Sequence, residues 1–333
     1  MASLELLRLI DEAKRCECAG LDGVWFSDFQ EPFNRWPELY VVLSTIAPHL
    51  KRAFVGSLIT DVLRRHPVVV AHAFATLSHV TGEGRLILGL GAGGSNSLEP
   101  YGISTKDSVS KLAEGIDMIR GLWNAMPTSP LMYSGKHFTA KKAGSPLQPR
   151  SRIPIYIASY GPRMLRLTAR VGDGWVPESH TPSTYKATLE EIRKEMKESG
   201  RDVDALEPCA SVIFYPFEPA PEQYRRLLDA AKNYLISYPF ILKRIASVPE
   251  ELICTTTNLK FDEEEKYAEL REQIPDDLAD ELLVYGKDEA CVRRLGRFLE
   301  SGCKHFILEP YWIERSRLAD SIVAAGRMFH ELR

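Results

Sequence analysis

The sequence predicts an α/β fold in which a parallel sheet is covered by crossover helices. Short apolar stretches typical of buried strands alternate with amphipathic stretches of helical period along most of the 333 residues. Turns that contain glycine or aspartate follow several of the apolar stretches, at the edge of a parallel sheet where ligands bind. The length suffices for one (β/α)8 barrel with insertions or for two smaller domains.

The predicted elements begin with a helix over residues 4–19, which ends before Gly20. Pro67 opens a later helix, and Pro239 must break the long helical stretch 221–247. Further helices are expected at 110–124, 162–171, 183–199, 288–301 and 313–332. The predicted strands are 23–27, 53–60, 85–90, 153–158, 174–177, 209–215 and 304–308. A barrel needs one strand more, so the first strand is missing from this chain or replaced by an insertion.

Two stretches do not follow the alternation and are interpreted as insertions in a single domain over residues 1–333. Residues 125–152 are rich in proline, glycine and lysine, and we expect irregular structure there. Residues 255–280 are acidic and polar, and we expect an exposed helix or lid.

Composition and charge exclude several classes of partner. Apolar residues make up 44% and charged residues 26% of the chain, with a formal net charge of −3. Clustered basic residues, which nucleic-acid binding requires, are absent from the sequence. No apolar run reaches the roughly 20 residues of a membrane-spanning helix, and the N-terminal amphipathic segment does not resemble a signal peptide. We expect a cytoplasmic protein that acts on a small molecule.

The six cysteines show no spacing typical of a metal site. Cys16 and Cys18 are close in sequence, but they would lie on different faces of a helix. We therefore expect reduced thiols and no metal.

Three turns at predicted strand ends are candidate ligand sites. Thr60-Asp61 follows one strand, Gly91-Ala92-Gly93 the next, and Ala158-Ser159-Tyr160-Gly161 a third. Glycine lets the backbone approach a planar ring or a phosphate without a Cβ in the way. The turn at 158–161 leads into a helix that starts at Pro162, so its N–H groups could hold an anion, to which Arg163 could add charge. No G-x-G-x-x-G of a nicotinamide-binding domain leads from a strand into a helix.

Three sequence blocks resemble one known family of enzymes. They are GLDGVWFSDF, VGSLITDVLRRHPVVVAHAFATLSHVTGEGRLILGLGAGG and IPIYIASYGPRMLRLTARVGDGW. They look like the luciferase-like flavin and deazaflavin oxidoreductases, with the strongest likeness to the methylenetetrahydromethanopterin reductase group that uses coenzyme F420. The resemblance covers residues 4–180, with a weaker echo at 302–310.

The resemblance implies a (β/α)8 TIM barrel with a ring cofactor in its mouth. It also implies a non-proline cis peptide at about Leu58-Ile59 that supports the ring from behind. By the same resemblance, Asp28 would lie near the reactive face, and Thr60 and Asp61 near the polar edge of the ring. The phosphate of the cofactor side chain would be held by Ala158, Ser159, Tyr160 and Gly161.

Two positions depart from the pattern of related sugar-phosphate dehydrogenases. Phe29 stands where they have a histidine, and Gly94 where they have a carboxylate. A histidine base is therefore absent there, which favours reduction of an activated acceptor over proton abstraction from an alcohol. Asp28 and Glu178 are the candidate catalytic residues, and His180 and Asp61 are further candidate proton donors.

The function that these observations favour is hydride transfer between coenzyme F420 and a small organic substrate, such as a methylene-tetrahydromethanopterin-type C1 carrier. One alternative is an FMN-dependent monooxygenase of the luciferase type. Another is a non-catalytic barrel that binds a cofactor. The resemblance also implies a homodimer.

Overall fold

The structure is a computed structural model that describes residues 2–29, 37–178, 180–245, 248–257, 264–310 and 313–332. It divides into two compact units, Met1–Ala158 and Ser159–Arg333. Each unit has its own parallel strands and its own apolar core. None of the described helices is long and apolar enough to cross a membrane.

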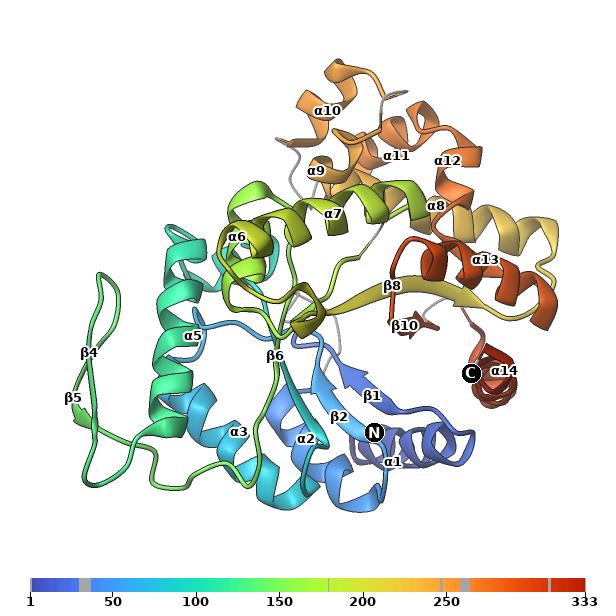
Figure 1. The fold of residues 1–333 in the computed structure, drawn as a ribbon. Coiled ribbons are helices and arrows are strands. Elements are labelled where there is room, and N and C mark those ends of the chain that lie inside the picture. The colour runs from blue at the N-terminus through green and yellow to red at the C-terminus, as the bar shows by residue number, and fades with distance from the viewer. Residues whose placement is uncertain are drawn as a thin grey trace. The chain divides into compact units, whose positions relative to one another are not determined.

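Four parallel strands form the sheet of the first unit (Figure 1). The strand β1 (Gly23–Phe26) pairs with β2 (Phe54–Ser57), and β2 pairs with β3 (Leu86–Leu90). On its other side β3 pairs with β6 (Ile155–Ile157). All five residues of β3 are buried, as expected for a parallel strand that is covered on both faces. The sequence predicted each of these strands.

The strand β2 ends earlier than the predicted boundary at residue 60. Its ladder stops at Ser57, and the Leu58-Ile59 peptide is cis, as the family resemblance implies. Pairing then resumes at Thr60, which bridges Leu90 of β3. The carboxyl end of β2 is thus a bulged segment rather than a regular strand.

The helices of the first unit include one that the sequence analysis missed, α2 (Leu39–Ile46). Its Leu39, Val42, Leu43 and Ile46 are buried and follow a helical period, which was the available signal. The other elements are α1 (Ala2–Cys18), η1 (Ala47–His49), α3 (Pro67–Thr81), α4 (Ser95–Leu98), η2 (Glu99–Tyr101) and α5 (Ser108–Asn124).

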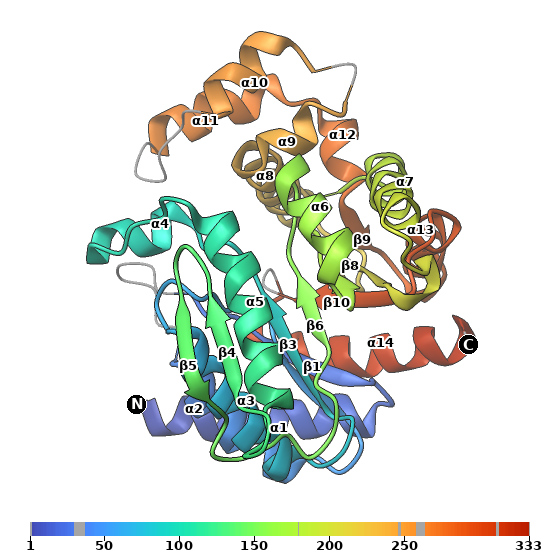
Figure 2. The same ribbon diagram turned by 60° about the vertical axis from the view of Figure 1, so that its left-hand side comes forward.

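The insertion at 125–152 contains an antiparallel hairpin rather than wholly irregular structure. The strands β4 (Leu131–Ser134) and β5 (Thr139–Ala143) lie beside α5 in both views of the ribbon (Figures 1 and 2). Glu114 of α5 accepts hydrogen bonds from the backbone N–H groups of Lys136, His137 and Phe138 at 2.8–3.1 Å. The carboxylate therefore fixes the hairpin to the helix.

In the second unit, β8 (Glu207–Tyr215) is the central strand. It pairs in parallel with β7 (Gly174–Trp175), β9 (Leu283–Tyr285) and β10 (His305–Glu309). The sequence analysis missed β9, which brings the parallel strands of the described residues to eight. Its three residues are too few to show a strand pattern.

The helices of the second unit agree well with the predicted ranges. Proline occupies the first position of α6 (Pro162–Val171) and α7 (Pro182–Glu198), where its missing N–H costs no hydrogen bond. The long helical stretch ends at Ser237, before Pro239, as predicted. The helices after α7 are α8 (Pro221–Ser237), α9 (Pro239–Leu242), α10 (Glu250–Thr257), α11 (Glu264–Gln273), α12 (Asp276–Asp280), α13 (Asp288–Glu300) and α14 (Leu318–Leu332), and the 3-10 turns are η3 (Val203–Ala205) and η4 (Arg315–Arg317).

The described parts of the acidic stretch 255–280 are mostly helical, but they are not simply a solvated face. Leu270, Ile274 and Ala279 are buried in the apolar core that includes Leu227 of α8. The expectation of an exposed segment is wrong for these positions, because one face of α11 and α12 packs on α8. Residues 258–263 of this insertion and 246–247 of the preceding helical prediction lie outside the described residues.

Candidate functional site

A buried charge network surrounds Asp28, directly after β1 in the first unit. The Asp28 residue is 6% exposed. Its Oδ2 accepts a hydrogen bond from the Thr60 hydroxyl at 2.7 Å and lies 2.6 Å from Arg65 Nη1. The Nη2 of Arg64 is 3.1 Å from the same oxygen. The Asp28 carboxylate is therefore paired with two guanidinium groups.

Asp61 holds the turn after β2. Its Oδ1 accepts the backbone N–H groups of Leu63 and Arg64, both at 2.8 Å, and its Oδ2 lies 2.6 Å from Arg64 Nη2. Arg64 also donates to the backbone carbonyl of Asp28 at 2.7 Å. Thr60 and Asp61 both follow β2, as predicted. Their side chains belong to the network around Asp28, because Thr60 hydrogen-bonds to Asp28 and Asp61 pairs with Arg64.

The sequence analysis missed the arginines and Tyr40. The Arg65 guanidinium lies over the Tyr40 ring at 4.4 Å and also pairs with Glu38. Burial raises the pKa of Tyr40, and its hydroxyl has no hydrogen-bond partner among the described residues. Two adjacent arginines between apolar positions were the available signal, since buried arginine needs an acidic partner.

Glycines at the end of β3 allow a close approach of β2 and β3. A Cβ on Gly91 would lie 2.0 Å from Ile59 Cδ1, and one on Gly89 would lie 2.0 Å from the Ser57 carbonyl oxygen. Leu58, Ile59 and Ala92 remain partly accessible, and Gly93 is exposed with φ of 76°. This edge therefore presents apolar side chains next to accessible backbone. Ala158, at the end of β6, donates its N–H to Leu90 O at 2.9 Å.

In the second unit, the predicted phosphate turn precedes α6. Ser159 is buried, and its hydroxyl accepts a hydrogen bond from Thr168 at 2.9 Å. Gly161 is the N-cap residue of α6 and provides no side-chain cap. The first turn of this helix therefore keeps N–H groups without a capping side chain, and the exposed Arg163 lies in the same turn.

Glu178 lies after β7 and contacts a pair of tyrosines. The Tyr238 hydroxyl donates to Glu178 Oε2 at 2.5 Å, and the Tyr238 ring stacks on Tyr160 with centroids 4.4 Å apart. Burial raises the pKa of Glu178 and of both tyrosines. The tyrosines therefore remain protonated donors, and Glu178 can hold a proton closer to neutral pH than an exposed glutamate.

A second buried carboxylate, Glu309, ends β10 and was missed by the sequence analysis. It is 5% exposed, accepts a hydrogen bond from Tyr234 OH at 2.8 Å and contacts the Ser211 hydroxyl. Burial, followed by the negative charge of Glu178, raises the pKa of Glu309 to about 7. The segment GCKHFILEP predicted the strand, but nothing in it indicated the partners of its glutamate.

His180 is a buried neutral imidazole. Its Nδ1 is 3.1 Å from Thr184 Oγ1, its ring meets Trp175 edge-on, and its Nε2 has no partner among the described residues. Burial, with a smaller contribution from the charge of Arg244, lowers the pKa of His180 to about 3. It is therefore a poor proton donor at neutral pH.

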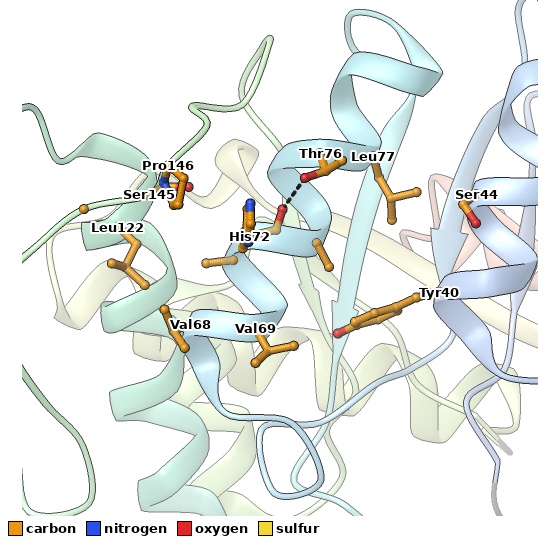
Figure 3. Close-up of a pocket in the computed structure, with 13 residues that line it drawn as sticks. Tyr40, Ser44, Val68, Val69, His72, Thr76, Leu77, Leu122, Ser145 and Pro146 are labelled. Atoms are coloured by element: carbon orange, nitrogen blue, oxygen red, sulfur yellow. Dashed lines mark hydrogen bonds between the residues drawn. The ribbon is translucent and has the colours of Figure 1, made fainter.

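A groove of about 530 Å³ lies on the first unit, and its lining includes Tyr40, the residue over which Arg65 lies. Figure 3 shows Tyr40 and Ser44 of α2 on one side and Val68, Val69 and His72 along α3. Leu122 of α5 and residues 144–146 complete the lining. Val68 and Val69 are 41% and 49% exposed, so the groove has an apolar rim.

No cluster of three or more potential metal ligands occurs in the part of the chain that the structure describes.

The chain is similar to several curated proteins, two of which are described here. The chain is 37% identical over 177 residues to the phthiodiolone/phenolphthiodiolone dimycocerosates ketoreductase of Mycobacterium bovis, covering 52% of this chain and 46% of that protein. It is 32% identical over 209 residues to the F420-dependent glucose-6-phosphate dehydrogenase of Nakamurella multipartita, covering 60% of each. The matches thus span about half of these relatives' length.

Solved structures show the fold over nearly the whole chain. An F420-dependent secondary alcohol dehydrogenase matches 98% of this chain and 95% of its own, with a TM-score of 0.78 and 22% identity. The coenzyme F420-dependent tetrahydromethanopterin reductase of Methanopyrus kandleri matches 98% and 96%, with a TM-score of 0.76 and 18% identity. The long-chain alkane monooxygenase LadA has a TM-score of 0.71 and 16% identity over 99% of this chain and 85% of its own.

The predicted TIM-barrel fold is therefore confirmed. The family model described as luciferase-like monooxygenase matches residues 2–305, which is most of the sequence. The chain belongs to the luciferase-like monooxygenase family.

Proposed function

We propose that the chain is an F420-dependent oxidoreductase that transfers hydride between the deazaflavin and a small organic substrate. The observation that carries the proposal is the edge after β2 and β3, where half-buried Leu58 and Ile59 lie beside the glycine turn at 91–93. An accessible apolar surface next to exposed backbone suits a flat ring. The names of the F420-dependent relatives and structural neighbours support the same cofactor.

The residues of this edge fit such a ring. Leu58, Ile59 and Ala92 would pack on it, and the backbone at Gly91 and Gly93 would approach it. Asp28, Thr60 and Asp61 would hold the edge in place through their hydrogen bonds and through the two arginines. The deazaflavin, when bound, supplies a two-electron hydride carrier.

The turn at 158–161 and Glu178 are the remaining residues of the proposed site. The turn of Ala158, Ser159, Tyr160 and Gly161 would hold the phosphate at the start of α6, where helix N–H groups favour an anion. Glu178 would carry the proton of the reaction, since its carboxyl is hydrogen-bonded and its pKa is raised by burial.

The substrate class follows from the need for a proton. A ketone accepts hydride at carbon and a proton at oxygen, and Glu178 could supply the proton. A methylene-tetrahydromethanopterin-type C1 carrier needs only hydride at its activated carbon, so Glu178 would then be dispensable. Activity of Glu178→Gln with each substrate type distinguishes the two.

The experiment that tests the cofactor is an anaerobic fluorescence titration of the protein with F420, with FMN as the competitor. We expect saturable binding of F420 and a rise in melting temperature, because a ligand that binds the native state stabilises it. Absence of saturable F420 binding would overturn the proposal. Binding of FMN alone, with oxygen consumption on reduction, would establish the monooxygenase alternative. Binding of neither cofactor would indicate a barrel without flavin or deazaflavin chemistry.

We also propose a homodimer formed through the groove on α2 and α3. Val41, Val68 and Val69 are 51%, 41% and 49% exposed on these adjacent helices, and a second copy would cover them. Light scattering after size-exclusion chromatography should give a dimer, and Val69→Glu should give a monomer. Val323→Glu, at a position 53% exposed on α14, is the control and should leave the dimer intact. A monomeric wild type would contradict the proposal.

All six cysteines are free, which suits a reducing compartment. We propose a cytoplasmic protein on this ground. Cell fractionation of the source organism checks this, and recovery outside the cytoplasm would contradict it.

A further inference from the structure

Two buried carboxylates of the second unit are held by one end of the same helix. Tyr234 of α8 donates to Glu309, and Tyr238, the C-cap residue of α8, donates to Glu178. The N–H of Tyr238 bonds to the carbonyl of Tyr234 at 3.1 Å, so the two residues are one helical turn apart. Side chains four residues apart on a helix are neighbours, and their two carboxylate partners are therefore brought together.

The strands give a second, independent link. The backbone N–H of Ser211 in β8 bonds to the carbonyl of Pro177, the residue before Glu178, at 3.3 Å. The Ser211 hydroxyl in turn contacts Glu309, whose strand β10 pairs with β8. Ser211 therefore contacts both groups: its N–H bonds to the peptide that precedes Glu178, and its hydroxyl contacts the carboxylate of Glu309.

We propose that Glu178 and Glu309 hold one proton between them and that Glu309, the more buried of the two, is the positioning residue that sets the protonation of the catalytic carboxyl. The inference rests on the proposed function for its catalytic meaning. It assigns a role to Glu309, which forms no part of the predicted site.

The hydrogen bonds of Glu309 suit a carboxyl that changes its protonation. One oxygen accepts from Tyr234, and the other contacts a hydroxyl that can either donate or accept. The neighbouring titratable groups are Glu178 after β7, Tyr160 before α6, and Tyr234 and Tyr238 at the end of α8. No cation is among these, so two adjacent negative charges would be costly and one proton is retained.

With this pair as the proton donor, the atoms and charges of carbonyl reduction balance. Hydride from the reduced coenzyme would form the new C–H bond, and one proton from the pair would form the O–H bond of the alcohol. One further proton would leave the coenzyme for solvent when the hydride is lost, and the pair would take one proton back from solvent. The net reaction converts one ketone and one reduced coenzyme into one alcohol and one oxidised coenzyme.

The first test uses the protein without cofactor and follows the melting temperature of wild type and Glu309→Gln from pH 5 to pH 8. The amide oxygen can accept one of the two hydrogen bonds, and its NH2 can donate to the hydroxyl of the other partner, so the variant should fold. The pKa of Glu309 is raised by burial to about 7 in the folded state, against about 4.3 in the unfolded chain. The stability that this shift contributes is present at low pH and is lost as pH rises towards 7.

Wild type should therefore lose stability between pH 5 and pH 7 relative to Glu309→Gln. Tyr234→Phe removes a hydrogen bond that lowers the Glu309 pKa. This variant should therefore continue to lose stability at higher pH than wild type does. Glu190→Gln, at an exposed position on α7, is the matched control and should follow wild type. Parallel curves for wild type and Glu309→Gln would overturn the proton-sharing pair.

The second test is the pH dependence of kcat/KM for ketone reduction. Glu309→Gln removes the negative charge next to Glu178. The apparent pKa of the acidic group in the kcat/KM profile should therefore fall by about one pH unit, since coupled groups interact by at least this much. An unchanged profile in an active Glu309→Gln variant would overturn the inference alone. Failure of wild type to bind F420 would overturn the proposed function, and with it the catalytic role of the pair, whatever the melting curves show.

Discussion

The Thr60 hydroxyl donates a hydrogen bond to Asp28 Oδ2 at 2.7 Å, and this contact joins the ends of β1 and β2. The same oxygen lies 2.6 Å from Arg65 Nη1 and 3.1 Å from Arg64 Nη2. Both arginine side chains are largely buried, at 14% and 8% exposure. Arg64 also pairs with Asp61 and Arg65 with Glu38, so Asp28 is the carboxylate that the two arginines share.

Asp28→Asn should destabilise the protein by about 1–3 kcal/mol, because it removes the carboxylate that two largely buried guanidinium groups share and leaves each with one acidic partner, Asp61 or Glu38. Asp107→Asn is the control, since Asp107 pairs with Lys136 at the surface and its left-handed backbone tolerates asparagine. Urea unfolding monitored by tryptophan fluorescence measures both. An equal effect of the two substitutions would show that the network does not depend on the Asp28 charge.

Gly91→Ala should destabilise the protein by about 1–3 kcal/mol through overpacking. The added Cβ would lie 2.0 Å from Ile59 Cδ1. Ile59→Val removes that atom, so the double variant should recover part of the lost melting temperature. Gly94→Ala is the control, because its nearest neighbour would be the Ser97 hydroxyl at 3.4 Å. Failure of Ile59→Val to rescue would refute this account of the glycine.

Arg163→Ala should weaken F420 binding about two- to fivefold, which is the contribution of an exposed ion pair. Arg166→Ala, exposed one turn further along α6, is the matched control and should bind as wild type does. Fluorescence titration at low and high salt measures the affinities. The difference between the variants should shrink at high salt, because ions screen exposed charges. Equal affinities at low salt would remove Arg163 from the phosphate site.

His180→Phe should become more stable relative to wild type as pH falls. Burial lowers the pKa of His180 to about 3, below the unfolded value of about 6.5, so wild type loses stability as pH falls from about 6.5 toward 3. Phenylalanine keeps the edge-on contact with Trp175 and does not titrate. Melting temperatures at pH 7.5 and pH 4.5 measure the effect. The exposed His49→Phe is the control, and the same pH trend in both variants would contradict the prediction.

Local patterns predicted much of the fold. The helix at 162–171 has the expected bounds because proline starts it and an amphipathic pattern defines its length. The short strand at 283–285 and the helix at 39–46 were missed, the first because three residues carry too little pattern. The packing of Leu270 and Ile274 on the core was missed because the surrounding charges dominate that stretch.

The candidate site was predictable only where the residue type itself carries the information. Glycine turns at strand ends can be read from the sequence, because backbone freedom is a local property. The cis peptide at Leu58-Ile59 came from the family resemblance and is confirmed. The partners of Asp28 and Glu178 could not be deduced, since a carboxylate in the sequence gives no indication of which distant side chain it meets.

By itself, the sequence determined the alternation of strands and helices, the position of the glycine turns and the membership of the family. The tertiary structure alone decided that Arg64 and Arg65 neutralise Asp28 and that Glu178 and Glu309 share one environment. The physical reason is that burial and neighbouring charge set the protonation and role of a carboxylate, and both arise from contacts between segments far apart in the chain.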